Sequence, residues 1–484
     1  MKVLLVQPGE SQGSVGFRKL ARPEPLALEI LAAALLDEHE VRIADLRVDP
    51  DLKRALRDFQ PDVVGVTGYT VDVPDMLWIC QQVKEESPQI TTVVGGYHAT
   101  LCPQDFNCAW VDVIVAGEGE ETLPELVRAL ERGEDLRAVP GLILRDDGEQ
   151  VATGPRPLLT DLDTSPLPAR ELTAAYRDQY HFQFWPSHAA METARGCPYR
   201  CKFCSVWVFH RKRCRFKSPE RVLEELRTLT GDIICFVDDN FFQRLPRAER
   251  IADMIRSEGL KFKYWIQARS DSIVRRPDLV EKWASIGLST VLVGFEKYRE
   301  DELDDLNKRS SVHTNEEAAR ILRANGVDIW GAFIVDPQWG RPDFDALIEY
   351  VRRLKISFPQ FTVLTPLPGT DFFREKFQEL TTRNYELFDF LHSVLPTRLP
   401  IQEFYENMAR LYASTTMSLS DLKERIRTGR IQVASLRRVK DLLAEVTNPE
   451  SYMRGLRDLH EKASEQLRKG SMGQLALLGE KGAH

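Results

Sequence analysis

Long apolar runs are absent from this 484-residue sequence, and so is a strong excess of one charge. No stretch approaches the roughly 18 consecutive apolar residues that span a bilayer, which argues against a membrane-spanning protein. Residues 1–6 are too short for a secretory signal and lack a cleavage site, so they indicate a first buried strand. A formal net charge of −8 gives no sign of nucleic-acid binding. Eight cysteines in a chain of this size, without a signal, predict reduced thiols and a cytoplasmic protein.

Phosphate-binding signatures are also missing. The sequence has neither a G-x-G-x-x-G fingerprint nor a Walker loop, which disfavours a dinucleotide or a triphosphate as ligand. Residues 1–150 instead alternate short apolar runs with helical patterns, and this predicts an α/β domain with a doubly wound, Rossmann-like parallel sheet. The expected strands are residues 2–7, 41–46, 63–69, 90–95 and 112–116, and the expected helices are residues 25–37, 51–59, 74–86 and 122–132.

Three of these strands end in glycine-rich loops. Ligands of a doubly wound sheet lie beyond the carboxyl ends of its strands, and glycine lets the backbone approach a bulky ligand closely. We therefore predict a binding edge made of three loops, which contain Gly68, Tyr69 and Thr70; Gly95, Gly96, Tyr97 and His98; and Gly117, Glu118, Gly119 and Glu120. Ordinary turns of a ligand-free domain would also account for these glycines.

Prolines in residues 151–187 disfavour helix and predict an interdomain linker with one short helix over residues 169–180. The alternation of strands and helices resumes over residues 188–375, which predicts a partial (β/α)6 barrel of TIM type. Residues 376–484 lose the strand pattern and predict a helical C-terminal region, disordered after Ser471. The expected barrel strands are residues 190–193, 233–237, 263–268, 290–294, 328–335 and 361–365, and the expected barrel helices are residues 219–230, 247–258, 277–286, 315–325 and 343–355.

A cysteine motif follows the first barrel strand, where such barrels carry their reactive groups. Cys197, Cys201 and Cys204 have the spacing C-x3-C-x2-C, with no fourth cysteine nearby at metal-site spacing. Cysteine thiolates are the usual ligands of iron–sulfur clusters, and three of them leave one iron of a four-iron cluster open. A structural zinc site would need a fourth ligand, for which Cys214 or His210 is available.

The cysteine motif, with Phe203 before its last cysteine, resembles that of the radical S-adenosylmethionine (SAM) enzymes. The resemblance implies a [4Fe-4S] cluster on the three cysteines, with SAM on the open iron. Groups in the cysteine loop and at later strand ends would hold the rest of SAM: Phe203, Asp238, Asp239, Arg269, Glu296 and Pro366. The acidic groups can accept from the ammonium and ribose, arginine can pair the carboxylate, and the backbone near Phe203 and Pro366 can hold adenine. Helix caps and local salt bridges are the structural alternative for the charged residues.

The glycine-rich loops resemble those of the cobalamin-binding domain that precedes many radical SAM domains, chiefly through residues 93–100 and 111–120. A D-x-H-x-x-G segment, whose histidine binds cobalt in other cobalamin proteins, is absent here, and the radical SAM relatives also lack it. The resemblance therefore implies cobalamin without a histidine ligand. It also implies that Tyr69, Thr70 and Val71 lie under the corrin.

A cobalamin domain, a barrel and a helical tail in this order resemble the cobalamin-dependent radical SAM enzymes. That family implies methylation of an unactivated carbon: one SAM methylates cobalamin, a second yields the radical that activates the substrate, and flavodoxin or ferredoxin supplies electrons. Residues 24–29, 334–339, 380–385 and 395–400 are similar to the hopanoid C-3 methylase group, which implies a polycyclic isoprenoid lipid as substrate. The alternatives are a radical SAM enzyme that cyclises or couples carbon frameworks without methyl transfer, and a non-catalytic corrinoid- or metal-binding protein.

Two features of the C-terminal region bear on substrate and location. Tyr385, Phe388, Phe390 and His392 are candidates for lining a substrate cavity, although aromatic residues at this spacing also suit a core. Residues 423–440 contain seven Lys or Arg against one Glu, interleaved with Leu and Ile. This pattern suits either peripheral contact with the inner membrane surface or a solvated helix face.

Overall fold

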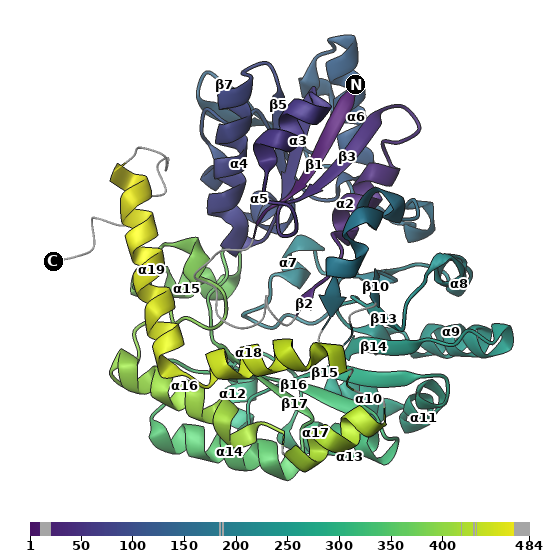
Figure 1. Ribbon diagram of the computed structural model, residues 1–484, viewed down its shortest axis with the longest axis vertical. Helices are drawn as coiled ribbons and strands as arrows, with labels where there is room; N and C mark the ends of the chain where they lie inside the picture. Colours follow the sequence, from purple (N-terminus) through teal and green to yellow (C-terminus); the bar gives the residue numbers. More distant parts are fainter. Residues whose placement is uncertain are drawn as a thin grey trace.

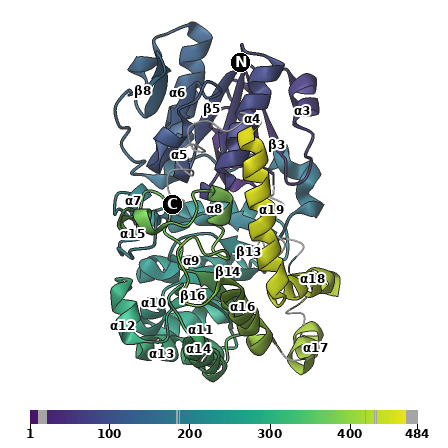
Figure 2. The same cartoon turned by 90° about the vertical axis from the view of Figure 1, so that its left-hand side faces the viewer.

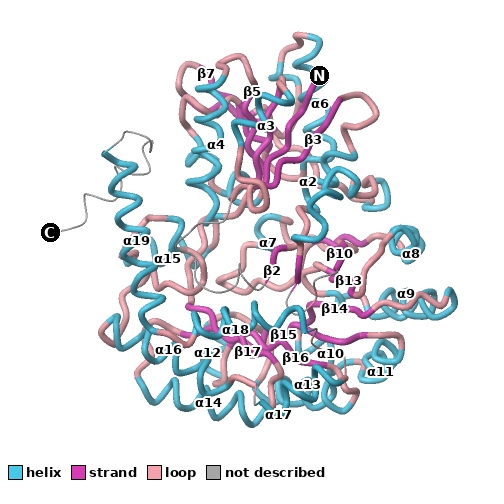
Figure 3. Tube along the Cα trace, in the orientation of Figure 1, coloured by secondary structure: helices cyan, strands magenta, loops and turns pink. Residues whose placement is uncertain are grey.

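The computed structural model describes residues 1–9, 21–182, 185, 188–417, 419–428, 431 and 433–468. Two sheets lie one above the other, with loops and the short helix α7 (Val206–Phe209) between them (Figures 1 and 3). Within these described ranges, no helix is both long and apolar enough to cross a membrane. The segment predicted to be disordered, after Ser471, lies outside the described residues.

The N-terminal sheet has the strand order β3-β1-β4-β5-β6-β7-β8, and its first five strands are parallel. The strands are β1 (Lys2–Gln7), β3 (Glu40–Asp45), β4 (Val63–Thr67), β5 (Thr91–Gly95), β6 (Val113–Val115), β7 (Leu142–Asp146) and β8 (Glu149–Ala152). The order reverses between β1 and β4, and at such a switch point doubly wound sheets bind their ligands. The predicted Rossmann-like domain is confirmed.

Helices cover both faces of this sheet because successive side chains of a buried strand point to opposite sides. Leu4 of β1 packs with the helices α3 and α4 on one face, and Leu5 packs with α2 and α6 on the other. The helices are α2 (Leu26–Ala33), α3 (Leu52–Phe59), α4 (Val73–Glu86), α5 (Tyr97–Leu101) and α6 (Gly119–Arg132).

The hairpin of β7 and β8 extends the sheet beyond the sequence prediction. Both strands are mostly exposed or half-buried, so they lack the continuous apolar run that identifies the parallel strands. β8 also crosses residue 150, the expected end of the domain. Further along, the predicted linker helix is present as a 3-10 helix (Arg170–Gln179), and β9 (His181–Phe182) pairs with β2 (Ala21–Arg22).

The second sheet has six parallel strands in sequence order, β10-β13-β14-β15-β16-β17, and its two outer strands do not pair with each other. The partial barrel is thus confirmed. Its strands are β10 (His188–Met191), β13 (Ile233–Phe236), β14 (Lys263–Ala268), β15 (Leu288–Glu296), β16 (Asp328–Val335) and β17 (Phe358–Val363). Its main helices are α8 (Pro219–Thr228), α9 (Leu245–Glu258), α10 (Ser270–Arg275), α11 (Pro277–Ser285), α12 (Glu300–Asp305), α13 (Val312–Ala324) and α14 (Arg341–Leu354).

The C-terminal region is helical, as predicted, and extends along both halves of the molecule. It contains α15 (Asp371–Lys376), α16 (Ile401–Thr415), α17 (Leu419–Arg427), α18 (Leu436–Val446) and α19 (Pro449–Arg468). Tyr405 of α16 stacks on Tyr452 of α19 with ring centroids 5.3 Å apart. From there α19 rises along one side of the molecule toward the N-terminal domain (Figures 1 and 2).

The basic segment, residues 423–440, is divided between α17 and α18 rather than forming one helix. Arg425 pairs with Asp328 at the start of β16, with Nη1 and Oδ2 2.6 Å apart. Leu442 and Leu443 of α18 pack against the barrel core. Arg425 therefore holds α17 against the amino end of β16, and the apolar side chains Leu442 and Leu443 of α18 point into the protein.

Candidate active site

The cysteine motif occupies a loop between β11 (Ala194–Arg195) and β12 (Arg215–Phe216), which pair antiparallel and close its base. Gly196 enters the loop with a φ of +88°, and a Cβ there would lie 2.1 Å from the Arg213 carbonyl oxygen, so only glycine fits. Cys201 is buried, whereas Cys197 and Cys204 are half-buried. The loop thus presents three thiols on a sterically fixed backbone.

The three thiols suit a cluster better than a single ion. Their sulfur atoms are not all within 4.8 Å of one another, unlike a donor set for one metal ion, and in a cluster each cysteine binds a different iron. Burial, with the nearby thiols Cys201 and Cys197, raises the pKa of Cys204 to about 12. The Cys204 thiol would therefore release its proton on binding metal.

Arg269, at the end of β14, holds the cysteine loop. Its guanidinium donates to Asp271 (Nε–Oδ1 2.8 Å) and to the Lys308 carbonyl oxygen (Nη2–O 2.7 Å), and it covers the Tyr199 ring at 3.5 Å. Nη1 lies 4.0 Å from Sγ of Cys201. Most of its donors are thus engaged within the protein, which favours the structural alternative for this residue.

The two aspartates after β13 also act on the loop. Asp238 is buried and accepts from the Thr193 amide (2.6 Å), the Thr193 hydroxyl and the Ala194 amide (3.0 Å). Asp239 is half-buried and accepts from the Gly196 amide at 3.0 Å. Burial raises the pKa of Asp239 to about 7, and the charges of Asp238 and Glu192 add to this. Asp238 thus ties the backbone, while Asp239 retains solvent access beside the cysteines.

Glu296, at the end of β15, adopts a φ of +62° at an irregularity in the pairing with β16. Such a backbone is uncommon outside glycine and is typical of functional positions. Its Oε1 accepts from Nζ of Lys308 at 2.6 Å. A Cβ at position 294 would lie 2.3 Å from that oxygen, so Gly294 makes room for the pair. The carboxylate is therefore held at the carboxyl end of the barrel.

Phe203 lies beside the end of β17, as its predicted role with Pro366 requires. The ring packs against an apolar cluster that includes Ile334, Leu364 and Leu395. Pro366 is buried two residues beyond Leu364. The structure therefore brings the cysteine loop and the last barrel strand together around an apolar surface.

The glycine-rich edge of the N-terminal domain faces the barrel. Gly96 has a φ of +94°, and a Cβ there would lie 2.5 Å from Thr67 Oγ1. Tyr69 is 65% exposed, although its ring centroid lies 5.9 Å from that of Tyr97. Tyr69 is thus an exposed aromatic side chain between the two sheets.

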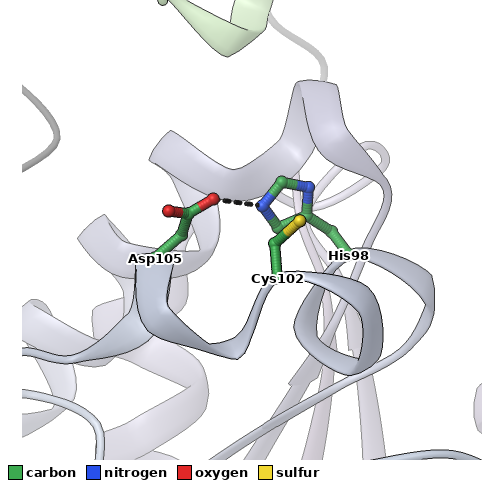
Figure 4. A group of neighbouring side chains, drawn as sticks. All are labelled: His98, Cys102 and Asp105. Atoms are coloured by element: carbon green, nitrogen blue, oxygen red, sulfur yellow. Dashed lines mark hydrogen bonds and ion pairs between the residues drawn. The ribbon is translucent and has the colours of Figure 1, made fainter. Parts of the chain in front are cut away.

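His98 belongs to a buried hydrogen-bonded group rather than to an open surface (Figure 4). Its Nδ1 lies 3.1 Å from the Thr70 hydroxyl and its Nε2 lies 2.9 Å from Asp105, which also accepts from the Tyr385 hydroxyl at 2.8 Å. Cys102 lies close enough that His98, Cys102 and Asp105 could together hold a metal ion. Both imidazole nitrogens of His98 are thus engaged within the N-terminal domain.

One polar contact between the domains is missing from the sequence prediction. Glu118 and Glu120 form ion pairs with Arg195, and Glu118 also pairs with Arg215 at 2.8 Å. Burial alone would raise the pKa of Glu118, but hydrogen bonds and charge attraction from Arg215 and Arg195 hold it below its ordinary value. The loop after β6 is thus bonded to both strands that close the cysteine loop. The basic stretch around Arg215 was the available signal, but it does not identify a partner.

The C-terminal aromatic residues divide into two groups. Phe388 and His392 are buried, and His392 bonds to Asp389 (2.9 Å) and to the Tyr452 carbonyl oxygen (3.2 Å), which fits a core. Tyr385 joins the same cluster and reaches the N-terminal domain through Asp105. Phe390 is 42% exposed with a φ of +66°, so it alone of the four keeps the features of a lining residue.

Comparison with known proteins agrees with this geometry. A model of the B12 binding domain matches residues 21–127, and a model of the radical SAM superfamily matches residues 191–351. The hopanoid C-3 methylase of Methylococcus capsulatus is 33% identical over 85% of this chain and 79% of its own length. The anaerobic magnesium-protoporphyrin IX monomethyl ester cyclase of Cereibacter sphaeroides is 28% identical over 85% of this chain and 70% of its own length.

Two solved structures share the fold. TsrM from Kitasatospora setae, a radical SAM methyltransferase with cobalamin and a [4Fe-4S] cluster bound, superposes with a TM-score of 0.66 at 18% identity, over 87% of this chain and 89% of TsrM. OxsB, a cobalamin-dependent SAM radical enzyme, gives a TM-score of 0.68 at 16% identity, over 98% of this chain and 81% of OxsB. With the two domain matches and the 33% identical methylase, the chain belongs to the cobalamin-dependent radical SAM methyltransferases, whose cofactors are a [4Fe-4S] cluster, SAM and cobalamin.

Proposed function

We propose that this methyltransferase acts on an unactivated carbon of a polycyclic isoprenoid lipid of the hopanoid type. The observation that carries the proposal is the 33% identity with the hopanoid C-3 methylase over most of both chains. Two of the segments similar to that group, residues 334–339 and 395–400, also contact each other. Gln338 donates to the Pro396 carbonyl oxygen at 2.6 Å. The backbone amide of Arg398 donates to the Pro337 carbonyl oxygen at 2.9 Å. Both contacts lie where the C-terminal region meets the barrel.

For the cluster we assign Cys197, Cys201 and Cys204, because they form a three-thiol set on a rigid loop. When bound, the cluster and SAM supply the substrate-activating radical, and cobalamin supplies the methyl group. Asp239 and Glu296 would accept from the ammonium and ribose of SAM. Phe203 and Pro366 would line the adenine site, while Asp238 and Arg269 would hold the loop in place. The chain's own task is to orient these groups and exclude water.

For cobalamin we assign the switch-point edge of the N-terminal sheet. The five glycines of this edge would leave room for the corrin, and Tyr69 and Thr70 would lie beneath it. His98 would support Thr70 from within the domain. The residues of this edge are Gly68, Tyr69, Thr70, Gly95, Gly96, Tyr97, His98, Gly117, Glu118, Gly119 and Glu120. Glu118 and Glu120 would act by fixing the edge against the cysteine loop.

The test is anaerobic reconstitution with iron, sulfide, cobalamin, SAM and a strong reductant, followed by incubation with a pentacyclic hopanoid or with magnesium-protoporphyrin monomethyl ester. We expect a hopanoid that has gained one methyl group, with SAM converted both to S-adenosylhomocysteine and to 5′-deoxyadenosine. Ring closure of the porphyrin without methyl transfer would instead favour the cyclase alternative, which the 28% identical relative makes worth including. Absence of both products with an intact cluster would reject the hopanoid proposal.

Two further partners follow from this proposal. A flavodoxin or ferredoxin would supply electrons, and a membrane surface would supply the lipid. For the membrane contact, the available features are the basic side chains of α17 and α18 and Val433, which is 67% exposed. Sedimentation with vesicles should therefore depend on anionic lipid and on salt concentration. Equal binding to neutral vesicles, or none to anionic ones, would exclude this surface.

A further inference from the structure

A chain of hydrogen bonds crosses between the two domains next to the cysteine loop. Glu118 of the N-terminal domain accepts from Nη1 of Arg215 at 2.8 Å, and the Leu159 carbonyl oxygen accepts from the same nitrogen at 2.8 Å. Nη2 of Arg215 lies 2.9 Å from Nδ1 of His210, and Nε2 of His210 lies 3.0 Å from the hydroxyl oxygen of Tyr97. The chain thus begins and ends in the N-terminal domain and passes through Arg215 of β12 and His210 of the cysteine loop.

The direction of each hydrogen bond follows from the chemistry of arginine. A guanidinium only donates and stays charged in proteins, so Nδ1 of His210 must be the acceptor and carry no proton. Burial, with the positive charge of Arg215, lowers the pKa of His210 to about 4, which keeps the ring neutral. The ring proton is therefore on Nε2 and is donated to the oxygen of Tyr97. The phenol's own proton must point to a different acceptor.

Tyr97 lies where such an acceptor would belong to a ligand. Its ring stacks on Phe209 of α7 with centroids 4.2 Å apart and lies beside the exposed Tyr69. Its hydroxyl oxygen lies 3.0 Å from Nε2 of His210, so the hydroxyl faces the cysteine loop. Among the described residues, His210 is the hydrogen-bond partner of this hydroxyl. Tyr97 itself is half-buried, which leaves its open side accessible.

We propose that Tyr97 donates a hydrogen bond to a carboxamide oxygen at the rim of bound cobalamin, and that His210, fixed by Arg215, is the positioning residue that directs this proton. The inference rests on the cobalamin site proposed above and names one contact in it. Cobalamin suits the donor because its corrin carries amide side chains around the ring. A half-buried donor fixed in advance also binds without losing rotational freedom of its hydroxyl.

The test uses an isosteric pair of variants at position 210. In His210→Gln, Arg215 fixes the amide oxygen toward itself, so the amide nitrogen still donates to Tyr97. In His210→Glu, the carboxylate instead accepts the Tyr97 proton and withdraws it from the ligand. Binding of hydroxocobalamin to the full chain, titrated by visible absorption after cluster reconstitution, should be about 3- to 10-fold weaker for His210→Glu than for His210→Gln. Tyr97→Phe keeps the stacked ring and should match His210→Glu.

The Tyr97→Phe background provides the control. There the Gln and Glu variants should bind hydroxocobalamin equally, because no phenol proton is left to direct. Equal affinity of the two variants in the Tyr97 background would overturn the proposal, and so would a difference that persists without the hydroxyl. Iron and sulfide contents matching the wild type would show that the cysteine loop is intact in each variant. If the wild-type chain binds no hydroxocobalamin, the cobalamin site itself fails and this contact fails with it.

Discussion

The loops of the two sheets lie at edges that face each other, but different kinds of residue form these two edges. The N-terminal edge depends on glycines, and Gly96 adopts a backbone that a side chain would block. The barrel edge depends on buried charges, such as Asp238 and Arg269, that bond to backbone and to neighbouring side chains. A glycine edge brings the backbone close to a large ring system, whereas a charged edge holds a loop rigid around a cluster. The difference supports our proposal that cobalamin binds at the glycine edge and the cluster at the barrel edge.

The largest effect should come from removing the thiols, which affects the barrel edge alone. In the triple variant Cys197→Ala, Cys201→Ala, Cys204→Ala, the cluster loses all its protein ligands. We expect less than a tenth of the wild-type iron after reconstitution and no 5′-deoxyadenosine from SAM, about a tenfold or greater loss. Hydroxocobalamin binding should persist, because the glycine edge lies in the other domain.

Cys214→Ala is the matched control for the thiols. Burial and the nearby Cys197 raise the pKa of the Cys214 thiol to about 11, so this cysteine lies beside the site and is a fair test of a fourth ligand. Full iron content in Cys214→Ala would exclude the zinc-type arrangement that uses this residue. His210 is the other candidate fourth ligand, and hydrogen bonds engage both of its nitrogens. Retained SAM cleavage in the triple variant would contradict the cluster assignment.

The complementary substitution, Gly96→Ala, perturbs the glycine edge instead of the barrel edge. The added Cβ would lie 2.5 Å from Thr67 Oγ1. The alanine backbone would also have to adopt a φ of +94°, which L-residues rarely do. We expect hydroxocobalamin affinity to fall at least tenfold while iron content after reconstitution stays at the wild-type level. Gly117→Ala separates the two causes, because its φ is +99° but a Cβ there meets nothing within 4 Å. Equal losses in both variants would mean that backbone strain, not crowding, limits this edge.

The sequence predicts most of the strands on both sides of this comparison. It does not predict the contacts between the domains, and this failure has a physical reason. The strands β1, β14 and β16 begin and end at the predicted residues because each is a buried run of mostly apolar residues. The cysteine motif can be singled out because its spacing is itself the signal, and its role as the cluster site stays a prediction. The pairing of Glu118 with Arg195 was missed, because the two are 77 residues apart and sequence pattern carries no distance across domains. The same applies to the buried ion pairs that Arg170 of the linker forms with Glu24 and Glu225, at the junction between the two domains.

That junction gives the next prediction, because it is charged like the barrel edge. Glu29 is fully buried, and its hydrogen-bond donor is the Thr173 hydroxyl. Burial, with the charge of Glu24, raises the pKa of Glu29 to about 7. The folded protein therefore holds a proton that the unfolded chain releases near pH 4.5. The stability contributed by this group is complete below pH 4.5 and is lost as the pH rises toward 7.

Glu29→Gln should remove this pH dependence. We expect the free energy of unfolding of the wild type to fall by roughly 2 kcal/mol more than that of Glu29→Gln between pH 4.5 and pH 8. Urea unfolding at both pH values measures the difference. Glu171→Gln, at an exposed position of the nearby 3-10 helix, should keep the wild-type dependence. Parallel pH profiles for wild type and Glu29→Gln would show that this carboxyl is ionised in the folded protein.

The smallest effect concerns the contact that joins the C-terminal region to the glycine edge. Tyr385→Phe keeps the ring, whose centroid lies 5.0 Å from that of His98, and removes only the hydrogen bond to Asp105. Asp105 still bonds to His98, so we expect a loss of about 1 kcal/mol in the free energy of unfolding and no change in iron content. Tyr264→Phe is the control, because the buried Tyr264 hydroxyl has no hydrogen-bond partner within the described part of the chain and its removal should cost nothing. A Tyr385→Phe variant as stable as the Tyr264→Phe variant would mean that apolar packing alone, through Phe388 and its neighbours, fixes the C-terminal region on this domain.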